Sequence, residues 1–181
     1  MDPVTRVQDE WLALRCQAGE PNAFQDLAKV VGQPLFYYAL KLTANPETAR
    51  DILQETWLRA HRGIRNLKDP ASVRPWLYSI VRAAAIDYIR RDTARERAEE
   101  IHSAEADRTA GESFDAEDAA EVHHALDQLE PRHREVLTLF FLEDFSHKEI
   151  AAVVGCAEGT VKSRLYYAKQ AMRELLKGKY A

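Results

Sequence analysis

The chain has 181 residues, of which 46% are apolar and 30% are charged, and its formal net charge is −4. It is apolar enough to build folded cores, which excludes a largely disordered chain. No apolar run approaches the roughly 18 residues that a membrane helix requires, and the first residues lack the basic and apolar segments of a secretion signal. We therefore expect a cytoplasmic protein that does not insert into membranes.

The charge is unevenly distributed along the chain. Residues 96–121 carry two Arg against ten Asp or Glu, whereas residues 1–95 carry 14 basic and 11 acidic side chains. The acidic stretch has too few large apolar residues to offset the entropy cost of ordering it. We predict a flexible acidic linker at residues 96–117, between one helical domain at residues 8–95 and a second at residues 118–178.

The first domain has the apolar spacing of helices. Short helices are predicted around residues 11–14 and 24–31, and a third is predicted to begin after Pro34. The best-marked helix follows Asn45, which suits the N-cap position, with Pro46 at the first helical position.

That helix is predicted to run to Gly63, and its outward stripe is polar apart from one leucine. The stripe repeats at the helical spacing i, i+3, i+4 and i+7: Asp51, Gln54, Glu55 and Leu58. From the residues alone, an ordinary solvated face and a binding surface explain this stripe equally well.

A loop at residues 64–71 is predicted to lead into a long helix at residues 73–92. Its expected buried stripe is Leu77, Val81, Ala84 and Tyr88. Arginines interleaved with aromatic residues are typical of surfaces that bind single-stranded nucleic acid, because rings stack on bases and guanidinium groups neutralise phosphates. Aromatic residues at helical spacing also build cores. Core packing is favoured for Trp76, whereas the two interpretations are balanced for Tyr78.

Residues 145–176 have the pattern of a helix-turn-helix. Ser146 and Glu149 have the spacing of a capping box, and Gly155 can adopt the positive φ that a tight turn needs. Residues 157–181 carry six Lys or Arg against two Glu. This local excess favours a surface that faces DNA phosphates over an ordinary helical hairpin with a solvated basic face.

Two further helices are predicted to support the helix-turn-helix. The expected inward residues are Val122, Ala125, Leu126 and Leu129 in the first, and Val136, Leu137 and Phe140 in the second, which Pro131 opens.

No metal or cofactor is expected. His123, His124 and His133 lack a set of Cys or carboxylate partners at ligand spacing. Cys16 and Cys156 are far apart in the sequence, so we expect small buried side chains rather than a disulfide or a metal pair.

Three stretches, in this order and spacing, resemble bacterial RNA polymerase sigma factors of the extracytoplasmic-function group: TARDILQETWLRAHRGI, RPWLYSIVRAAAIDYIRR and LEPRHREVLTLFFLEDFSHKEIAAVVGCAEGTVKSRLYYAKQAM. The resemblance covers nearly the whole chain. It implies an all-α fold with the two domains that the family calls region 2 and region 4. It also implies a transcription initiation factor, not an enzyme, that reads the minus-35 duplex and the melted minus-10 strand of a promoter.

The resemblance assigns roles to particular residues. Asp51, Gln54, Glu55 and Leu58 would dock on a coiled coil of the polymerase β′ subunit. Residues expected near the melted minus-10 strand and the adjacent duplex are Asn66, Lys68, Asp69, Ser72, Arg74, Trp76, Arg82, Asp87, Arg90 and Arg91. Residues expected at the minus-35 element are Lys148, Thr160, Lys162, Ser163, Arg164, Tyr166, Tyr167, Lys169 and Arg173. The polymerase β flap, promoter DNA and an anti-sigma protein are further expected partners of a chain that is monomeric when free.

Ala83 departs from the family pattern. Many relatives carry Asn there, and its amide can read a flipped base, whereas the alanine side chain has no donor or acceptor. Either base capture relies on the loop and the backbone, or the minus-10 preference differs. A stand-alone helix-turn-helix regulator and a helical adaptor remain as alternatives, although the regulator leaves the QETW and PWLYSIVR stretches without a role.

Overall fold

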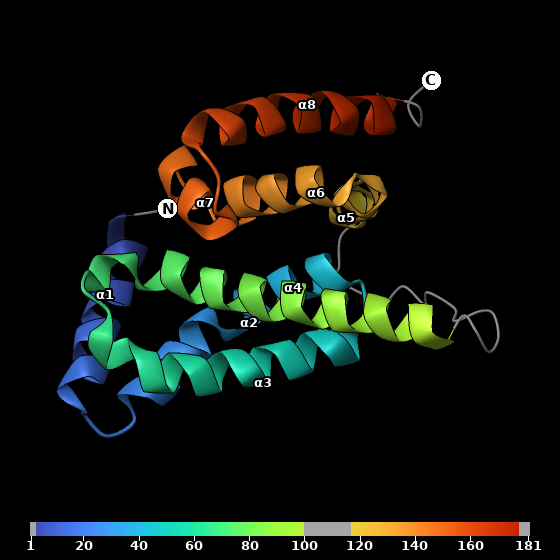
Figure 1. The fold of residues 1–181 in the computed structure, drawn as a ribbon. Coiled ribbons are helices and arrows are strands. Elements are labelled where there is room, and N and C mark those ends of the chain that lie inside the picture. Colours follow the sequence, from blue (N-terminus) through green and yellow to red (C-terminus); the bar gives the residue numbers. More distant parts are fainter. Residues whose placement is uncertain (1–2, 100–116, 178–181) are drawn as a thin grey trace. The chain divides into compact units, whose positions relative to one another are not determined.

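The computed structural model describes residues 3–99 and 117–177, and all regular elements in these ranges are helical (Figure 1). The all-α prediction is therefore confirmed. The helices form two compact units that divide near residue 110. None of the helices in the described ranges combines the length and the apolar character that a membrane crossing requires.

Within residues 3–99, the first unit is a bundle of four α-helices: α1 (Pro3–Ala18), α2 (Ala23–Thr43), α3 (Pro46–Gly63) and α4 (Val73–Glu99). Helices α2, α3 and α4 pack against one another. Helix α1 lies across one end of them, against two short 3-10 turns, η1 (Ile64–Asn66) and η2 (Pro70–Ser72) (Figure 1). The largest fully buried side chains of this core are Leu27, Val31, Leu35, Tyr38, Val73, Leu77, Tyr78 and Val81.

Helix α2 runs without interruption through Pro34, so the prediction of two helices divided at this residue is wrong. A proline in a helix interior removes a backbone hydrogen bond and costs about 3 kcal/mol. The buried side chains of Leu27, Val31 and Leu35 follow one another at intervals of four across the proline. One apolar stripe therefore packs on α3 and α4, and its burial offsets the cost.

Helix α3 begins as predicted. The side chain of Asn45 accepts hydrogen bonds from the backbone N–H groups of Glu47 at 2.9 Å and Thr48 at 3.0 Å. These bonds satisfy two donors that the first turn of a helix otherwise leaves without a partner.

Helix α4 is longer than predicted, because it continues to Glu99 and makes residues 96–99 helical. Residues 100–116 of the predicted linker lie outside the described residues, and its last residue, Glu117, begins α5. Tyr78 is fully buried with its ring 5.1 Å from that of Tyr38, so it belongs to the core. Tyr88, predicted to be buried, is 37% exposed near the end of the bundle.

Helix α1 is tied to the start of α4 by a buried ion pair. Asp9 accepts hydrogen bonds from Arg74, at 2.6 Å between Oδ2 and Nε and at 3.2 Å between Oδ1 and Nη2. Leu12 and Cys16 lie on the same buried face of α1, and burial raises the pKa of the Cys16 thiol. Trp11 lies on the opposite, exposed face.

Within residues 117–177, the second unit contains α5 (Glu117–Gln128), α6 (Pro131–Leu137), α7 (His147–Val154) and α8 (Glu158–Lys177). Helix α6 continues into a turn of π-helix, η3 (Thr138–Leu142), and runs beside α8 (Figure 1). Two of the residues predicted to face inward are not fully buried, since Val122 is exposed and Phe140 is half-buried.

Helices α7 and α8 form the predicted helix-turn-helix. The Ser146 hydroxyl accepts a hydrogen bond from the Glu149 N–H, and the Glu149 carboxylate accepts one from the Ser146 N–H, so the capping box is confirmed. Gly155 ends α7 with a φ of 71°, which favours glycine. Val161, Leu165 and Ala168 of α8 are buried against the rest of the unit.

Replacing Asp9 by Ala removes the carboxylate that faces the buried Arg74. Loss of one partner of a buried ion pair costs about 3–5 kcal/mol, so Asp9→Ala should lower the free energy of unfolding of the first unit by about 3 kcal/mol. All three tryptophans lie in this unit, so urea unfolding followed by tryptophan fluorescence reports on it alone. Asp51→Ala on the exposed face of α3 is the control and should cost less than about 0.5 kcal/mol. Equal losses in the two variants would contradict the role of the ion pair.

Candidate functional site

The predicted docking stripe on α3 is accessible along its whole length. Asp51, Gln54 and Glu55 are exposed, and Leu58 keeps 50% of its surface in contact with solvent. Glu55 accepts a hydrogen bond from Arg59 at 2.7 Å, an exposed pair of the kind that adds about 0.5 kcal/mol or less. The stripe therefore contributes little to the fold, and its side chains are available to a partner.

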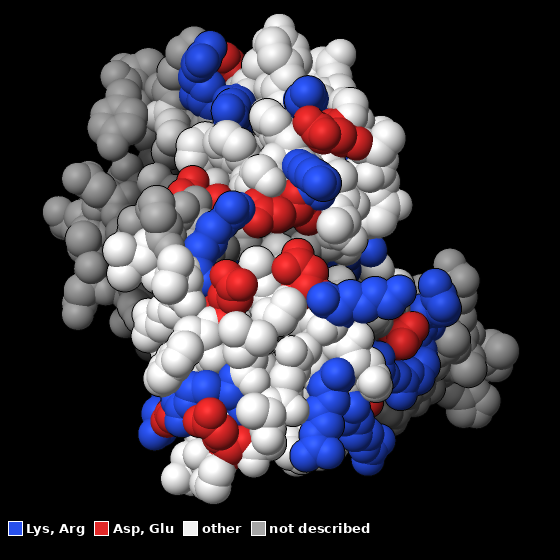
Figure 2. All heavy atoms as spheres, turned by 90° about the vertical axis from the view of Figure 1, so that its left-hand side faces the viewer, with Lys and Arg blue, Asp and Glu red and all other residues white. Residues whose placement is uncertain are grey.

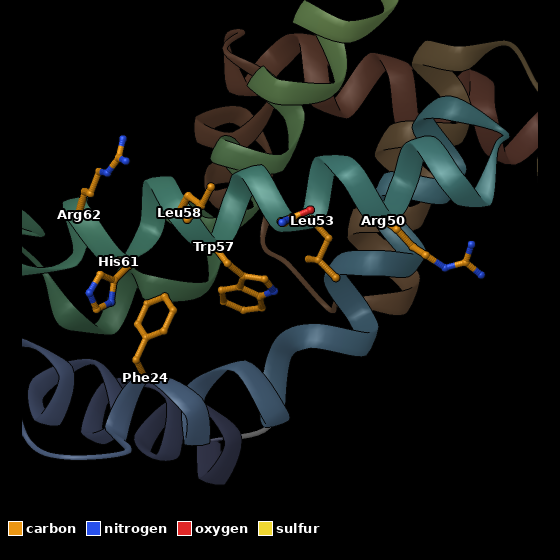
Figure 3. Close-up of a pocket in the computed structure, with 8 residues that line it drawn as sticks. Phe24, Arg50, Leu53, Trp57, Leu58, His61 and Arg62 are labelled. Atoms are coloured by element: carbon orange, nitrogen blue, oxygen red, sulfur yellow. The ribbon is translucent and has the colours of Figure 1, made fainter.

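An open groove of about 740 Å³ lies along the same helix (Figure 3). Phe24 points from α2 toward α3, where its ring meets those of Trp57 and His61 edge-on. The distance between ring centroids is 5.7 Å to Trp57 and 5.0 Å to His61. The residues that line the groove are Phe24, Arg50, Leu53, Gln54, Trp57, Leu58, His61 and Arg62. An apolar groove with polar residues at its rim is a typical site for a partner helix.

The groove brings Gln54 and Leu58 of the predicted stripe together with residues that the sequence analysis missed. Trp57 and His61 follow Gln54 at helical spacing, which was a usable signal. Phe24 comes from another helix, so no local pattern could place it there.

The turn between α3 and α4 carries several of the predicted minus-10 residues. Asn66, Lys68 and Asp69 are exposed. Asp69 caps η2, since its carboxylate accepts hydrogen bonds from the N–H of Ala71 at 3.2 Å and from the hydroxyl of Ser72 at 2.5 Å. Two of the predicted residues, Asp69 and Ser72, therefore shape the turn itself.

Trp76 lies half-buried beside this turn, on the first part of α4. A Cβ at Gly63 would lie 3.0 Å from Cζ2 of the indole, so the absence of a side chain at Gly63 allows the Trp76 ring to pack this close to the backbone. The Trp76 side chain packs on the backbone of α3 and is also partly open to solvent. It therefore contributes to the core and remains available for contact with nucleic acid, the two roles considered for it from the sequence.

Arg74 is not at this surface. It is 8% exposed, and its guanidinium group is bonded to Asp9 inside the bundle. Its partner comes from α1, which no spacing within residues 73–92 could indicate. Further along α4, Arg90 and Arg91 are exposed, Arg82 and Asp87 are partly exposed, and Ala83 faces solvent.

The outward face of α8 carries most of the predicted minus-35 residues. Tyr166 and Tyr167 are 59% and 58% exposed and meet edge-on with ring centroids 5.4 Å apart. The exposed members of the set are Lys148, Lys162, Ser163, Tyr166, Tyr167, Lys169 and Arg173, whereas Thr160 and Arg164 are partly covered.

Some of these polar side chains have partners within the unit. Lys162 Nζ lies 3.1 Å from the carboxylate of Glu158, and Ser163 donates to the carbonyl of Thr160 at 3.0 Å. Lys169 Nζ lies 4.7 Å from the ring centroid of Phe140. On the face drawn in Figure 2, Lys and Arg side chains are interspersed with Asp and Glu in the upper part and are grouped more densely toward the lower right.

The structure offers no support for a metal site in the ranges that it describes. Within residues 3–99 and 117–177, no three His, Cys, Asp or Glu side chains are grouped as metal ligands would be. Cys16 and Cys156 are both free thiols.

Two family models match the chain. The model described as Sigma-70 region 2 matches residues 27–95, and the model described as Sigma-70, region 4 matches residues 119–172. Each match falls within one of the two compact units.

Several characterised proteins are similar to most of the chain. It is 38% identical over 145 residues to the ECF RNA polymerase sigma factor SigL of Mycobacterium tuberculosis, which covers 77% of this chain and 80% of SigL. It is 35% identical over 161 residues to SigM of the same organism, with 88% and 80% covered. It is 29% identical over 188 residues to the RNA polymerase sigma-H factor of Pseudomonas aeruginosa, with 96% of each chain covered.

A similar solved structure is that of the sigma factor RpoE in complex with the anti-sigma factor NepR from Bartonella quintana. It superimposes with a TM-score of 0.74 at 26% identity, over 86% of this chain and 98% of that chain. CnrH in complex with the cytosolic domain of CnrY has the same fold, with a TM-score of 0.68 at 24% identity.

Gly63→Ala should strain the site beside the turn. The added methyl group lies 3.0 Å from the indole of Trp76, and overpacking of this kind costs about 1–3 kcal/mol. Gly32→Ala in α2 is the matched control, because its added Cβ lies 3.8 Å from Trp57, an ordinary contact, and removing a helical glycine stabilises by up to about 1 kcal/mol. Urea unfolding measures both changes, and a stabilised Gly63→Ala would contradict the packing described here.

Proposed function

Because the chain belongs to the extracytoplasmic-function sigma factors, a family of non-enzymatic factors that direct RNA polymerase to promoters, we propose that three of its surfaces divide this task among them. The surfaces are the α3 stripe with its groove, the turn that joins α3 to α4, and the outward face of α8. The observation that carries the proposal is their exposure, because each presents polar or aromatic side chains outward. On α3 and α8, the opposite side of the same helix fills a core.

The α3 surface is the docking site for core RNA polymerase. A coiled coil of the β′ subunit is a helical partner, and the groove beside Trp57 and Leu58 can take an apolar side chain from such a helix. Asp51, Gln54 and Glu55 then form the polar rim that fixes orientation.

The turn and α4 take the melted minus-10 strand. Asn66 and Lys68 offer exposed donors, and Trp76 offers a partly exposed aromatic ring for stacking. Arg90 and Arg91 suit the phosphates of the adjacent duplex. Of the two explanations that Ala83 left open, this arrangement favours base capture by the turn and its backbone. The proposed set is Asn66, Lys68, Asp69, Ser72, Trp76, Arg82, Asp87, Arg90 and Arg91, and Arg74 is left out because it is buried.

The outward face of α8 reads the minus-35 duplex. Lys162 and Ser163 can bond to base edges in the major groove, and the rings of Tyr166 and Tyr167 can contact thymine methyl groups. Lys148, Thr160, Arg164, Lys169 and Arg173 take the phosphates and set the orientation of the helix on the duplex.

Further partners follow from the same surfaces. The exposed side chains of Phe141 and Leu142 on η3 give the polymerase β flap an apolar contact. An anti-sigma protein is a further proposed partner, because the sigma factor RpoE, whose structure is similar, is in complex with the anti-sigma factor NepR. It would inhibit this chain by covering the polymerase-binding surface. The free chain is proposed to be a monomer that acts in the cytoplasm, where the polymerase is.

The docking role of α3 is tested by Asp51→Arg. A reversed charge at the rim of the interface should weaken binding of core RNA polymerase at least about tenfold, through like-charge repulsion or loss of a partner. Affinity is measured by fluorescence anisotropy of the labelled chain titrated with core enzyme. Gln33→Arg, which adds an arginine to an exposed position of α2, is the control and should bind normally. Unchanged affinity of Asp51→Arg would argue against the α3 site and, with it, the assignment of the groove.

The role of α8 is tested by the double variant Lys162→Ala and Tyr166→Ala. Each lost base contact is worth about 1–3 kcal/mol, so transcription from the chain's own promoters should fall by roughly tenfold or more while core binding is retained. The promoters are first obtained by mapping transcription start sites after overproduction. Gln170→Ala on the same helix is the control for run-off transcription. Equal damage to core binding and to promoter use would contradict the proposed division of labour.

A further inference from the structure

The turn between α3 and α4 is held in place by a side chain from α1. Gln17 donates from Nε2 to the backbone carbonyl of Ile64 at 3.0 Å and to that of Leu67 at 2.7 Å. A carboxamide nitrogen has two N–H donors, so both are used on this turn. The acceptors lie 47 and 50 residues away in the sequence, which makes this a contact of tertiary structure.

These two carbonyls bracket Asn66, whose side chain is exposed. Leu67, with φ −66° and ψ 113°, is the residue at which the chain leaves η1 and becomes extended. A hydrogen bond to its carbonyl therefore fixes the direction in which the backbone enters Lys68. The two exposed donors of the turn lie within and directly after the segment that Gln17 holds.

Other contacts make α1 a rigid support for this bond. The Asp9–Arg74 ion pair ties the same helix to the first turn of α4, on the far side of the turn. Gly19, which follows α1 with a φ of 74°, lies where an added Cβ would come within 3.4 Å of Nη2 of Arg65. Both ends of the turn are thus fixed to one helix. That helix lies outside residues 27–95, which the region 2 family model matches.

We propose that Gln17 is a positioning residue for capture of the melted promoter strand. It holds the backbone at residues 64–67 in the one conformation that presents Asn66 and Lys68 to the unpaired bases. This inference rests on the proposed function of the turn. Ala83 has no side-chain donor or acceptor, so recognition depends on how the turn itself is held.

The test uses holoenzyme assembled from the full chain and core RNA polymerase. Its probe is a fork-junction DNA whose unpaired strand is randomised over eight nucleotides, and bound DNA is separated and sequenced. The wild type should enrich particular bases at one or more positions. Gln17→Glu keeps the size of the side chain but turns a carboxylate toward two carbonyl oxygens, and it should reduce this enrichment about tenfold. Gln17→Met, which removes the donors without adding charge, should reduce it less.

Two comparisons separate this inference from its alternatives. Gln8→Glu makes the same change at an exposed position of α1 and should leave the enrichment unchanged. A purely structural role would lower binding of all sequences together, so an unaltered base preference in both Gln17 variants overturns the inference. If Gln17→Glu does not fold, the base enrichment measured with Gln17→Met alone decides whether the inference stands.

Asn66→Ala and Lys68→Ala test the premise in the same experiment. If both leave the base preference intact, the proposed function of the turn fails. If they abolish the preference while the Gln17 variants keep it, the turn reads the strand without help from α1, and only the further inference fails.

Discussion

The buried ion pair between Asp9 and Arg74 is the contact on which the arrangement of the first unit's binding surfaces depends. The planar guanidinium group of Arg74 donates two hydrogen bonds to the Asp9 carboxylate, which fix the orientation of the two side chains as well as the distance between them. Apolar contacts alone would hold α1 near α4 but would tolerate small shifts along the helix. Because the pair fixes α1 against α4, Gln17 meets the carbonyls of the turn. The exposed turn thus takes its shape from a helix that presents none of the proposed DNA-contacting residues.

Two of the proposed binding surfaces, those on α3 and α8, are the outer sides of helices whose inner sides build a core. On α3, Ile52 and Thr56 are buried, while Asp51 and Glu55 next to them are exposed. On α8, Leu165 is buried beside the exposed Tyr166. The rigidity of the packed side is transmitted through the helical backbone, so the outward side chains are held in register before a partner arrives. Such preorganisation lowers the entropy cost of binding.

The features that sequence predicted well are set by neighbouring residues. The N-cap at Asn45 and the capping box of Ser146 and Glu149 involve bonds across two or three positions, so their spacing is visible in the chain. The failures involve partners from elsewhere. Pro34 is tolerated because of packing on two other helices, and Arg74 is removed from the surface by a carboxylate 65 residues away. Phe24 was missed as part of the groove beside Trp57 for the same reason, because it comes from α2.

The division into two units decides how specific the whole chain can be. A single helix in the major groove, with a few side chains at base edges, supplies only a few kcal/mol of discrimination. The turn on the other unit has no side-chain reader at Ala83 and contributes a limited set of contacts of its own. Because both units belong to one chain, engagement of one raises the effective concentration of the other at the same promoter. Two modest readers whose binding energies add can select a promoter that neither could select alone.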